Sequence, residues 1–318
     1  MKIAAVSVVK DECDIIELFI RLNAPFLDHH YIVDDGSSDT TVQILNLLKA
    51  EGYPLSIRSD FAPEQRQRFQ STEAIKEAIK TRYYDWWINL DADEFILGDR
   101  ATLEGDLAKT PSEHCASIRW QTYVPFHDGT DWNLHRDFKP RVSEPHPGTK
   151  VIIPGKAAPH IMQVSGHHYV QVNGHSIHQT DVSLRLAHVP VRSSAQLVSK
   201  AIIGSHKLSL VPDRKPFEGF HWDRMADEAR QSGYRLSLEQ LQAMAYSYSL
   251  PSRIPVVHEC FETPRIGSEE VLVRYKELTS IPLLRRFDAY AKLLCSELSK
   301  VKNNVPPVPQ DAGTRSPR

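Results

Sequence analysis

Residues 31–39 form the sequence YIVDDGSSD, in which a short β-forming run passes directly into an acidic turn. Residues 86–94 repeat this arrangement as WWINLDADE. Each apolar run is bounded by acidic or turn-forming residues, which is the pattern of a short buried strand. We therefore expect strands at residues 31–33 and 86–90, each with carboxylates at its carboxyl end.

Further strand and helix patterns alternate around these two stretches. Strands are also predicted at residues 3–9 and 55–58, and apolar stripes at helical spacing predict helices at 14–22, 40–50 and 71–82. A repeated strand–helix order is typical of a mainly parallel sheet flanked by helices. The predicted fold class is therefore α/β.

Composition changes along the rest of the chain. Residues 100–190 are rich in Pro, His, Trp and Tyr and contain only short β-like runs, as in segments that line an enzyme cleft. The following residues have mostly helical patterns, at 194–208, 223–231, 237–248 and 282–299. Residues 303–318 have almost no apolar content, which predicts a disordered tail.

Charge and cysteine usage narrow the class of protein. The 318 residues include 38 Lys and Arg against 40 Asp and Glu, a net charge of −2, which disfavours a nucleic-acid binder. The four cysteines form no CxxC pair, which favours free thiols in a reducing compartment. No apolar run reaches the roughly 18 residues of a membrane span. We expect a cytoplasmic protein without a transmembrane segment.

The acidic cluster after the strand at 86–90 predicts a metal site. Asp91 and Asp93 are two residues apart, so in extended backbone both side chains point to the same side. Ligands of open α/β sheets bind beyond the carboxyl ends of the strands. Two carboxylates repel a diphosphate, but a Mg²⁺ or Mn²⁺ ion between them reverses this repulsion. The chain has no GxGxxG, GxxxxGK[ST], HExxH or GxSxG motif, so the sequence supports none of the sites that these motifs build.

With these two motifs, residues 33–39 and 89–95, the chain resembles family 2 glycosyltransferases of the GT-A fold. The resemblance is closest to a bacterial subgroup whose pattern continues over much of the chain, at residues 8–12, 120–125, 150–154, 166–168, 186–193 and 220–222. It implies an enzyme that uses a nucleotide diphosphate sugar, generally with inversion at the sugar carbon. The implied acceptor is a hydroxyl of a saccharide or of a lipid-linked molecule.

The resemblance also implies residue roles. It places the nucleotide on Glu12, Asp34, Asp35 and Asp91. It places Mn²⁺ or Mg²⁺ on Asp93, with His188 completing the metal shell. The chain departs from the subgroup at two positions that usually hold Asn, where it has Asp11 and His167.

Other candidate residues follow from residue chemistry. A guanidinium suits paired phosphate oxygens, so Arg68 or its neighbour Arg66 is a candidate contact for the donor diphosphate. Trp120 and Tyr123 are candidates for stacking on an acceptor sugar. The sequence leaves the catalytic base open among His168, Asp128, Asp131 and Asp181.

The expected organisation has three parts. A GT-A-like catalytic domain covers residues 1–192, with a donor half at 1–100 and a metal and acceptor half at 101–192. A helical region at 193–302 packs on it, and the tail follows. Within the helical region, the basic pair in LLRRF at residues 283–287 is a candidate for peripheral contact with a membrane surface.

Three alternative functions remain open. A nucleotidyltransferase shares a similar sheet and metal chemistry, and would release pyrophosphate. A non-catalytic protein on the same scaffold would bind saccharide without turnover. Six histidines lie between residues 160 and 188, which raises the possibility of a zinc hydrolase, although their spacing fits no standard zinc pattern.

Overall fold

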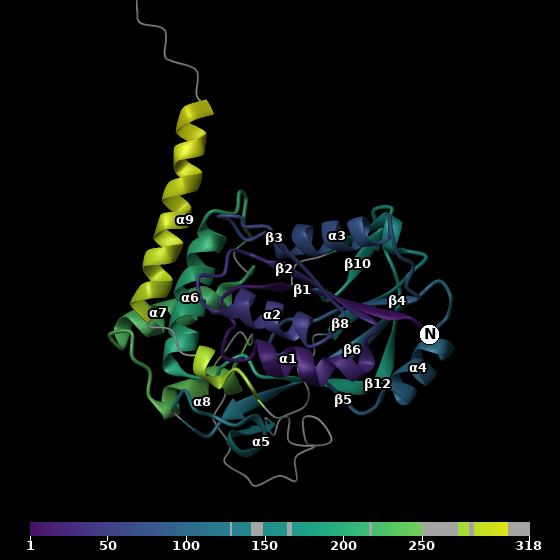
Figure 1. The fold of residues 1–318 in the computed structure, drawn as a ribbon, viewed down its shortest axis with the longest axis horizontal. Coiled ribbons are helices and arrows are strands. Elements are labelled where there is room, and N and C mark those ends of the chain that lie inside the picture. Colours follow the sequence, from purple (N-terminus) through teal and green to yellow (C-terminus); the bar gives the residue numbers. More distant parts are fainter. Residues whose placement is uncertain are drawn as a thin grey trace, which may run out of the picture.

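The computed structural model describes residues 1–127, 129–140, 149–163, 167–215, 218–248, 250, 273–279 and 283–304. Figure 1 shows a large central sheet with helices packed around it. Asp128 and residues 305–318, most of the expected tail, lie outside the described part of the chain.

One half of the sheet is wholly parallel. Its strands lie in the order β3 (Leu55–Ser59), β2 (His29–Asp34), β1 (Ile3–Val9) and β4 (Trp86–Asn89). The connections between successive strands contain α1 (Ile16–Asn23), α2 (Thr41–Ala50) and α3 (Gln67–Ala78). This is the α/β arrangement that the alternating strand and helix patterns predict.

The third of these helices begins earlier than predicted, at Gln67 instead of Ser71. Two hydroxyl residues in its second turn fit within the helix because their side chains bond to carbonyls of the first turn. Ser71 Oγ donates to the carbonyl of Gln67 at 2.8 Å, and Thr72 Oγ1 donates to the carbonyl of Arg68 at 2.6 Å.

The other half of the sheet mixes strand directions. Next to β4 come β8 (Thr149–Pro154), β6 (Cys115–Pro125), β12 (Gln179–His188) and β5 (Glu94–Leu97), with β7 (Phe138–Pro140) on the side of β6. Only β6 and β12 are parallel in this half. Two helices belong to it, α4 (Arg100–Lys109) and α5 (Leu134–Asp137). A small second sheet contains β9 (Ile161–Gln163), β10 (Val170–Val172) and β11 (His175–Ser176).

β12 is a long strand that the sequence analysis does not predict. Buried Val182, Leu184 and Leu186 alternate with exposed polar residues along it. This period of two is a strand pattern, but the polar half of it makes the run look irregular in the sequence. β12 ends at His188 and thereby carries that imidazole to the same edge as the acidic strand ends.

β1 anchors the sheet between two apolar layers. Ile3 and Ala5 belong to the core that includes residues of α1 and α2, whereas Ala4 and Val6 belong to the core that includes residues of α3. Because β1 is buried on both faces and paired along both edges, its position is tightly fixed.

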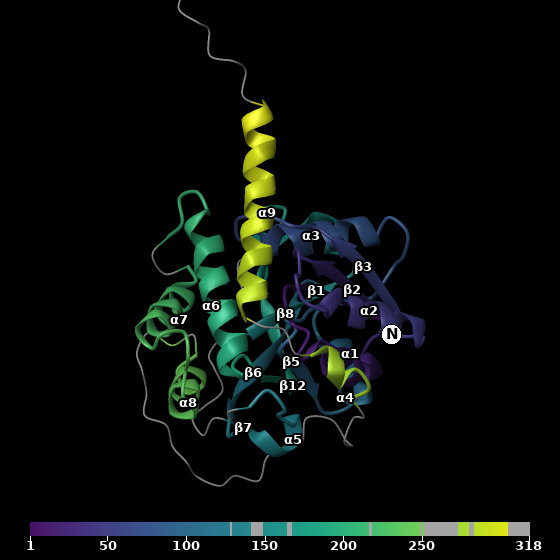
Figure 2. The ribbon, with the colours of Figure 1, turned by 60° about the vertical axis from the view of Figure 1, so that its left-hand side comes forward.

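The C-terminal part is helical, as predicted. It contains α6 (Ser194–Ser209), α7 (Phe220–Gln231), α8 (Leu238–Tyr246) and α9 (Leu283–Asn304), with a 3₁₀ turn, η4 (Lys276–Leu278), before α9. Figure 2 shows α9 beside α6, with its far end extending beyond the body of the molecule. Among the described residues, no helix is both long and apolar enough to cross a membrane.

Candidate functional site

A cavity of about 520 Å³ opens at the carboxyl edge of the parallel strands. Six carboxylates from the ends of β1, β2 and β4 line it: Asp11, Glu12, Asp35, Asp91, Asp93 and Glu94. Parallel strands place their carboxyl ends at one edge of a sheet, which is why residues so far apart in the sequence meet here.

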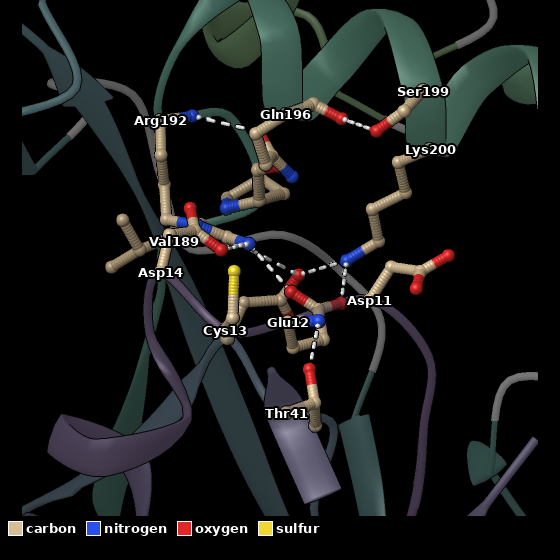
Figure 3. Close-up of polar contacts among 12 residues, drawn as sticks. Asp11, Glu12, Cys13, Asp14, Thr41, Val189, Arg192, Gln196, Ser199 and Lys200 are labelled. Carbon is tan, nitrogen blue, oxygen red and sulfur yellow. Dashed lines mark hydrogen bonds and ion pairs between the residues drawn. The ribbon is translucent and has the colours of Figure 1, made fainter. Parts of the chain in front are cut away.

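Basic side chains from later in the chain pair with these carboxylates. Arg192 Nη2 donates to Glu12 Oε2 at 2.5 Å, and Lys200 Nζ donates to Glu12 Oε1 and Asp93 Oδ2, both at 2.8 Å. Figure 3 shows the Arg192 and Lys200 side chains converging on Glu12. Charges buried this deeply require such partners, so the basic residues allow the acidic edge to fold.

Two further ion pairs join lysines to carboxylates that line the cavity. Lys150 donates to Asp91, and Lys207 Nζ donates to Asp35 Oδ2 at 2.7 Å. Glu94 differs, because burial raises its pKa to about 8 despite Lys150 nearby. The Glu94 carboxyl is therefore mostly protonated at neutral pH.

Asp93 and His188 face each other across the site. Asp93 Oδ1 lies 3.7 Å from His188 Nε2, and His188 Nδ1 has no hydrogen-bond partner among the described residues. Burial lowers the pKa of His188 to about 4, so its imidazole is neutral. Burial opposes ionisation of Asp93, but the positive charges of Lys200 and Arg192 outweigh it and hold the pKa of that carboxyl well below its usual range.

These two donors fit a divalent ion as a pair of ligands. A carboxylate oxygen and a neutral imidazole nitrogen are both accepted by Mn²⁺. The described residues contain no group of three or more His, Cys, Asp or Glu side chains arranged for a metal. Water or the oxygens of a bound ligand would fill the remaining positions around an ion held by Asp93 and His188.

The two aspartates after β2 have different surroundings. Asp34 is buried, and its carboxylate accepts a hydrogen bond from the backbone N–H of Ser37 at 3.1 Å. Asp35 lines the cavity, whereas Asp34 is not among the residues that line it. The chain turns here through Gly36, whose φ of +73° is strained for any residue with a Cβ.

Like Asp34, the candidates Arg68 and Tyr123 do not line the cavity. The Arg68 guanidinium lies over the Phe69 ring, 4.6 Å from its centroid, and Gln67 instead lines the cavity and donates to Asp91 Oδ1 at 2.7 Å. Tyr123 is packed into the core and Trp120 lines the cavity. Because these two residues are three apart on β6, they point to opposite faces of the strand.

His168 lines the cavity beside Trp120, with ring centroids 5.3 Å apart. Its Nδ1 lies 2.9 Å from the carbonyl oxygen of Thr149, which can only accept, so Nδ1 carries the proton. The lone pair of the neutral ring is therefore on Nε2. Burial and the nearby Lys150 lower the pKa of His168, which favours the neutral form of the ring.

The other candidate bases lie elsewhere. Asp131 bonds to His127 and Asp181 bonds to Arg119, and neither aspartate lines the cavity. His167 is buried against Ser71, with Nε2 and Oγ 2.9 Å apart.

Aromatic rings form another part of the cavity wall, which adjoins the charged part where Lys200 Nζ lies 6.0 Å from the centroid of the Trp222 ring. Tyr248 lies at the centre of this wall, with ring centroids 5.1 Å from His188, 5.3 Å from His221 and 6.2 Å from Trp222. Phe220 and Tyr169 also line the cavity. The cavity thus has a charged end and an aromatic end.

The sequence analysis predicts no role for the four basic residues that pair with the carboxylates of the cavity. Arg192 and Lys150 lie inside the quoted motifs at 186–193 and 150–154, so their positions were visible but their partners were not. Lys200 and Lys207 are two helical turns apart and share one face of α6, a spacing that could have identified them together.

Comparisons with known proteins give similarity at the level of the fold. No family model and no curated protein sequence matches the chain. S. aureus TarS 1–349 in complex with UDP-GlcNAc matches 78% of this chain and 91% of its own, at 12% identity and a TM-score of 0.40.

Two further structures match shorter segments. The mannosyltransferase PcManGT from Pyrobaculum calidifontis, in complex with GDP-Man and Mn²⁺, matches 37% of this chain and 35% of its own, at 17% identity and a TM-score of 0.31. Glucosyl-3-phosphoglycerate synthase from Mycobacterium tuberculosis, in complex with Mn²⁺, UDP and glucosyl-3-phosphoglycerate, matches 36% of this chain and 42% of its own, at 19% identity and a TM-score of 0.26. TarS and these two proteins are GT-A glycosyltransferases.

Proposed function

We propose that this protein is a metal-dependent glycosyltransferase, which moves a sugar from a nucleotide diphosphate sugar to a hydroxyl of a saccharide or lipid-linked acceptor. The observation that carries the proposal is the facing pair of Asp93 Oδ1 and His188 Nε2, 3.7 Å apart at the edge of a parallel sheet. This pair supplies one anionic and one neutral donor inside a cavity large enough for a small ligand.

The charged end of the cavity is the proposed donor end. Asp93 and His188 would hold Mn²⁺ or Mg²⁺, and the bound ion would offset the charge that develops on the leaving diphosphate. Glu12, Asp35 and Asp91 are the proposed contacts of the nucleotide and ribose hydroxyls, which are hydrogen-bond donors.

The aromatic end is the proposed acceptor end. Trp120, Trp222 and Tyr248 present rings toward the cavity or its rim, and a ring face suits the apolar face of a pyranose. The two ends meet at His188, whose ring contacts both Trp120 and Tyr248. A sugar transferred from a donor at the charged end to an acceptor at the aromatic end would therefore react close to the ion held by Asp93 and His188.

His168 is the proposed base. With Nδ1 donating to the carbonyl of Thr149, the free lone pair on Nε2 can accept the proton of an acceptor hydroxyl. The hydroxyl oxygen would attack the sugar carbon as the bond to the diphosphate breaks, in a single displacement that inverts the configuration.

The test is a donor screen on the full chain. Folded protein is incubated with Mn²⁺, a panel of UDP- and GDP-sugars and mixed saccharide acceptors, and released nucleoside diphosphate is measured. We expect release with one donor class, its loss with EDTA and in Asp93→Asn, and its retention in Asp227→Asn, which changes an exposed carboxylate on α7. Release of pyrophosphate would instead support a nucleotidyltransferase. Absence of any nucleotide product would contradict the proposal.

A further inference from the structure

Lys200 occupies a central position in the charged end of the cavity. It projects from α6, and its Nζ lies 2.8 Å from Glu12 Oε1, 2.8 Å from Asp93 Oδ2 and 6.0 Å from the centroid of the Trp222 ring. Its side chain is 25% exposed, and Lys200 is among the residues that line the cavity. Lys200 is thus both a partner of the proposed metal ligand and accessible to whatever binds there.

The neighbouring cation, Arg192, is held more rigidly than Lys200. Its guanidinium is fully buried and bonds to Glu12 at 2.5 Å and to Asp14 at 2.7 Å, while its nearest approach to Asp93 is 3.9 Å. Glu12 therefore keeps a counter-charge even if Lys200 moves away. The flexible four-carbon stem of a lysine permits such a movement, whereas the buried fork of Arg192 does not.

The two oxygens of Asp93 have different partners, one a cation and one a neutral imidazole. Oδ2 accepts from Lys200, and Oδ1 faces His188 Nε2. An ion held by Oδ1 and His188 would lie within a few ångströms of the Lys200 ammonium, and the two like charges would repel. An anion that enters the cavity relieves this repulsion, because it can accept hydrogen bonds from Lys200 and coordinate the ion.

We propose that Lys200 makes metal binding depend on the donor nucleotide: its ammonium holds Asp93 in the empty site, and turns to the diphosphate oxygens when the nucleotide enters. This inference rests on the proposed function. In the empty protein Lys200 weakens metal binding, and in the nucleotide complex it contributes to diphosphate binding. Nucleotide and metal therefore strengthen each other's binding, and the coupling is reciprocal.

The test measures binding of Mn²⁺ alone. Mn²⁺ is titrated into the full chain, with bound and free ion distinguished by electron paramagnetic resonance, for wild type, Lys200→Met and Lys200→Arg. We expect Lys200→Met to bind Mn²⁺ at least about tenfold more tightly than wild type, because a monovalent charge beside the ion is removed. Lys200→Arg keeps the charge and should stay close to wild type.

A matched control comes from the same helix. Lys207→Met removes a lysine that also lines the cavity but pairs with Asp35. It should change Mn²⁺ affinity less than Lys200→Met does. Adding UDP or GDP should raise Mn²⁺ affinity by a larger factor in wild type than in Lys200→Met, where only direct coordination by the diphosphate contributes.

Two results would overturn the inference. One is Mn²⁺ affinity in Lys200→Met equal to or below that of wild type, in protein with an intact thermal unfolding transition. The other is an equal gain in Lys207→Met. Either result leaves the proposed function standing if wild type still binds Mn²⁺ together with a nucleotide. Absence of any Asp93-dependent Mn²⁺ binding, with or without nucleotide, contradicts the metal-dependent function as well.

Discussion

Arg286 Nη2 lies 3.0 Å from Asp39 Oδ2, which ties the last described helix to the loop that follows β2. The same guanidinium contacts Ser199 Oγ at 3.0 Å and Cys13 Sγ at 3.4 Å. Arg286 is 5% exposed, so only Arg285 of the basic pair considered for membrane contact is exposed. The buried member holds together α9, α6 and the acidic turn.

Replacing Arg286 should therefore destabilise the fold. We expect Arg286→Met to lower the free energy of unfolding by about 3–5 kcal/mol, because it leaves Asp39 buried without its counter-charge. Urea unfolding followed by circular dichroism measures this change. Arg285→Met, at an exposed position, should change stability by less than about 0.5 kcal/mol. Equal effects of the two variants would show that the Asp39 pair contributes little.

Removing the His188 imidazole should weaken metal binding. We expect His188→Gln to lower Mn²⁺ affinity, in the presence of UDP or GDP, by about 10–100-fold. Substitutions of residues that hold or orient metal ligands typically reduce metal affinity by this factor. Titration of Mn²⁺ followed by electron paramagnetic resonance gives the affinity directly. His206→Gln, an exposed histidine on α6, controls for incidental binding of Mn²⁺ to imidazole. Unchanged affinity in His188→Gln would remove His188 from the metal site.

His168 should set the acidic limb of the pH profile. Because burial and Lys150 lower the pKa of His168, the acidic limb of this proposed base should lie below the usual imidazole pKa of 6.5. We expect His168→Gln to reduce kcat by about 10²–10⁴-fold and to abolish this limb. The measurement is the pH dependence of kcat/KM for wild type and variant. A variant that keeps both rate and limb would assign the base elsewhere.

His30 should make stability depend on pH. It is buried beside Ser7, and burial lowers its pKa from 6.5 to about 3, with His29 adding to the shift. The unfolded chain therefore binds a proton below about pH 6.5 that the folded protein excludes, and stability falls as the pH drops from there toward 3.

The size of this effect is measurable by substitution. The contribution of His30 should fall by up to about 1.4 kcal/mol per pH unit on acidification. The stability advantage of wild type over His30→Gln should therefore shrink between pH 6.5 and 4 in urea unfolding. His175→Gln, at an exposed position on β11, should show no such trend. A difference between wild type and His30→Gln that is constant with pH would contradict the assignment.

The parallel half of the sheet was predictable because each of its strands and helices has a recognisable pattern within its own segment of the sequence. Apolar runs that end in acidic turns mark β2 and β4, and apolar stripes mark the helices between strands. The placement of Asp91 and Asp93 at one edge follows from these local patterns alone. The missed strand β12 has exposed Ser183 and Arg185 between its buried residues, and single-sequence patterns identify such mixed runs poorly.

The charge pairs were not predictable because they are not local. Lys200 meets Glu12 across 188 residues, and nothing in either segment specifies the other. The prediction for Arg68 has a related problem. Successive side chains on a helix differ in direction by about 100°, so Gln67 faces the cavity and Arg68 does not. Sequence patterns thus locate the acidic edge, and the fold decides which neighbours reach it.

The pairing of Glu12 with Arg192, 180 residues away, and of Asp93 with Lys200 has a consequence for the order of synthesis. A ribosome releases β1 and β4 long before α6, so a nascent chain that has completed the parallel strands still lacks the cations for its acidic edge. A fragment that stops at residue 192, the expected domain boundary, would lack Lys200 and Lys207 permanently. Residues 1–192 and the helical part that follows therefore depend on each other, and recombination at that boundary would not transfer residues 1–192 as a stable module.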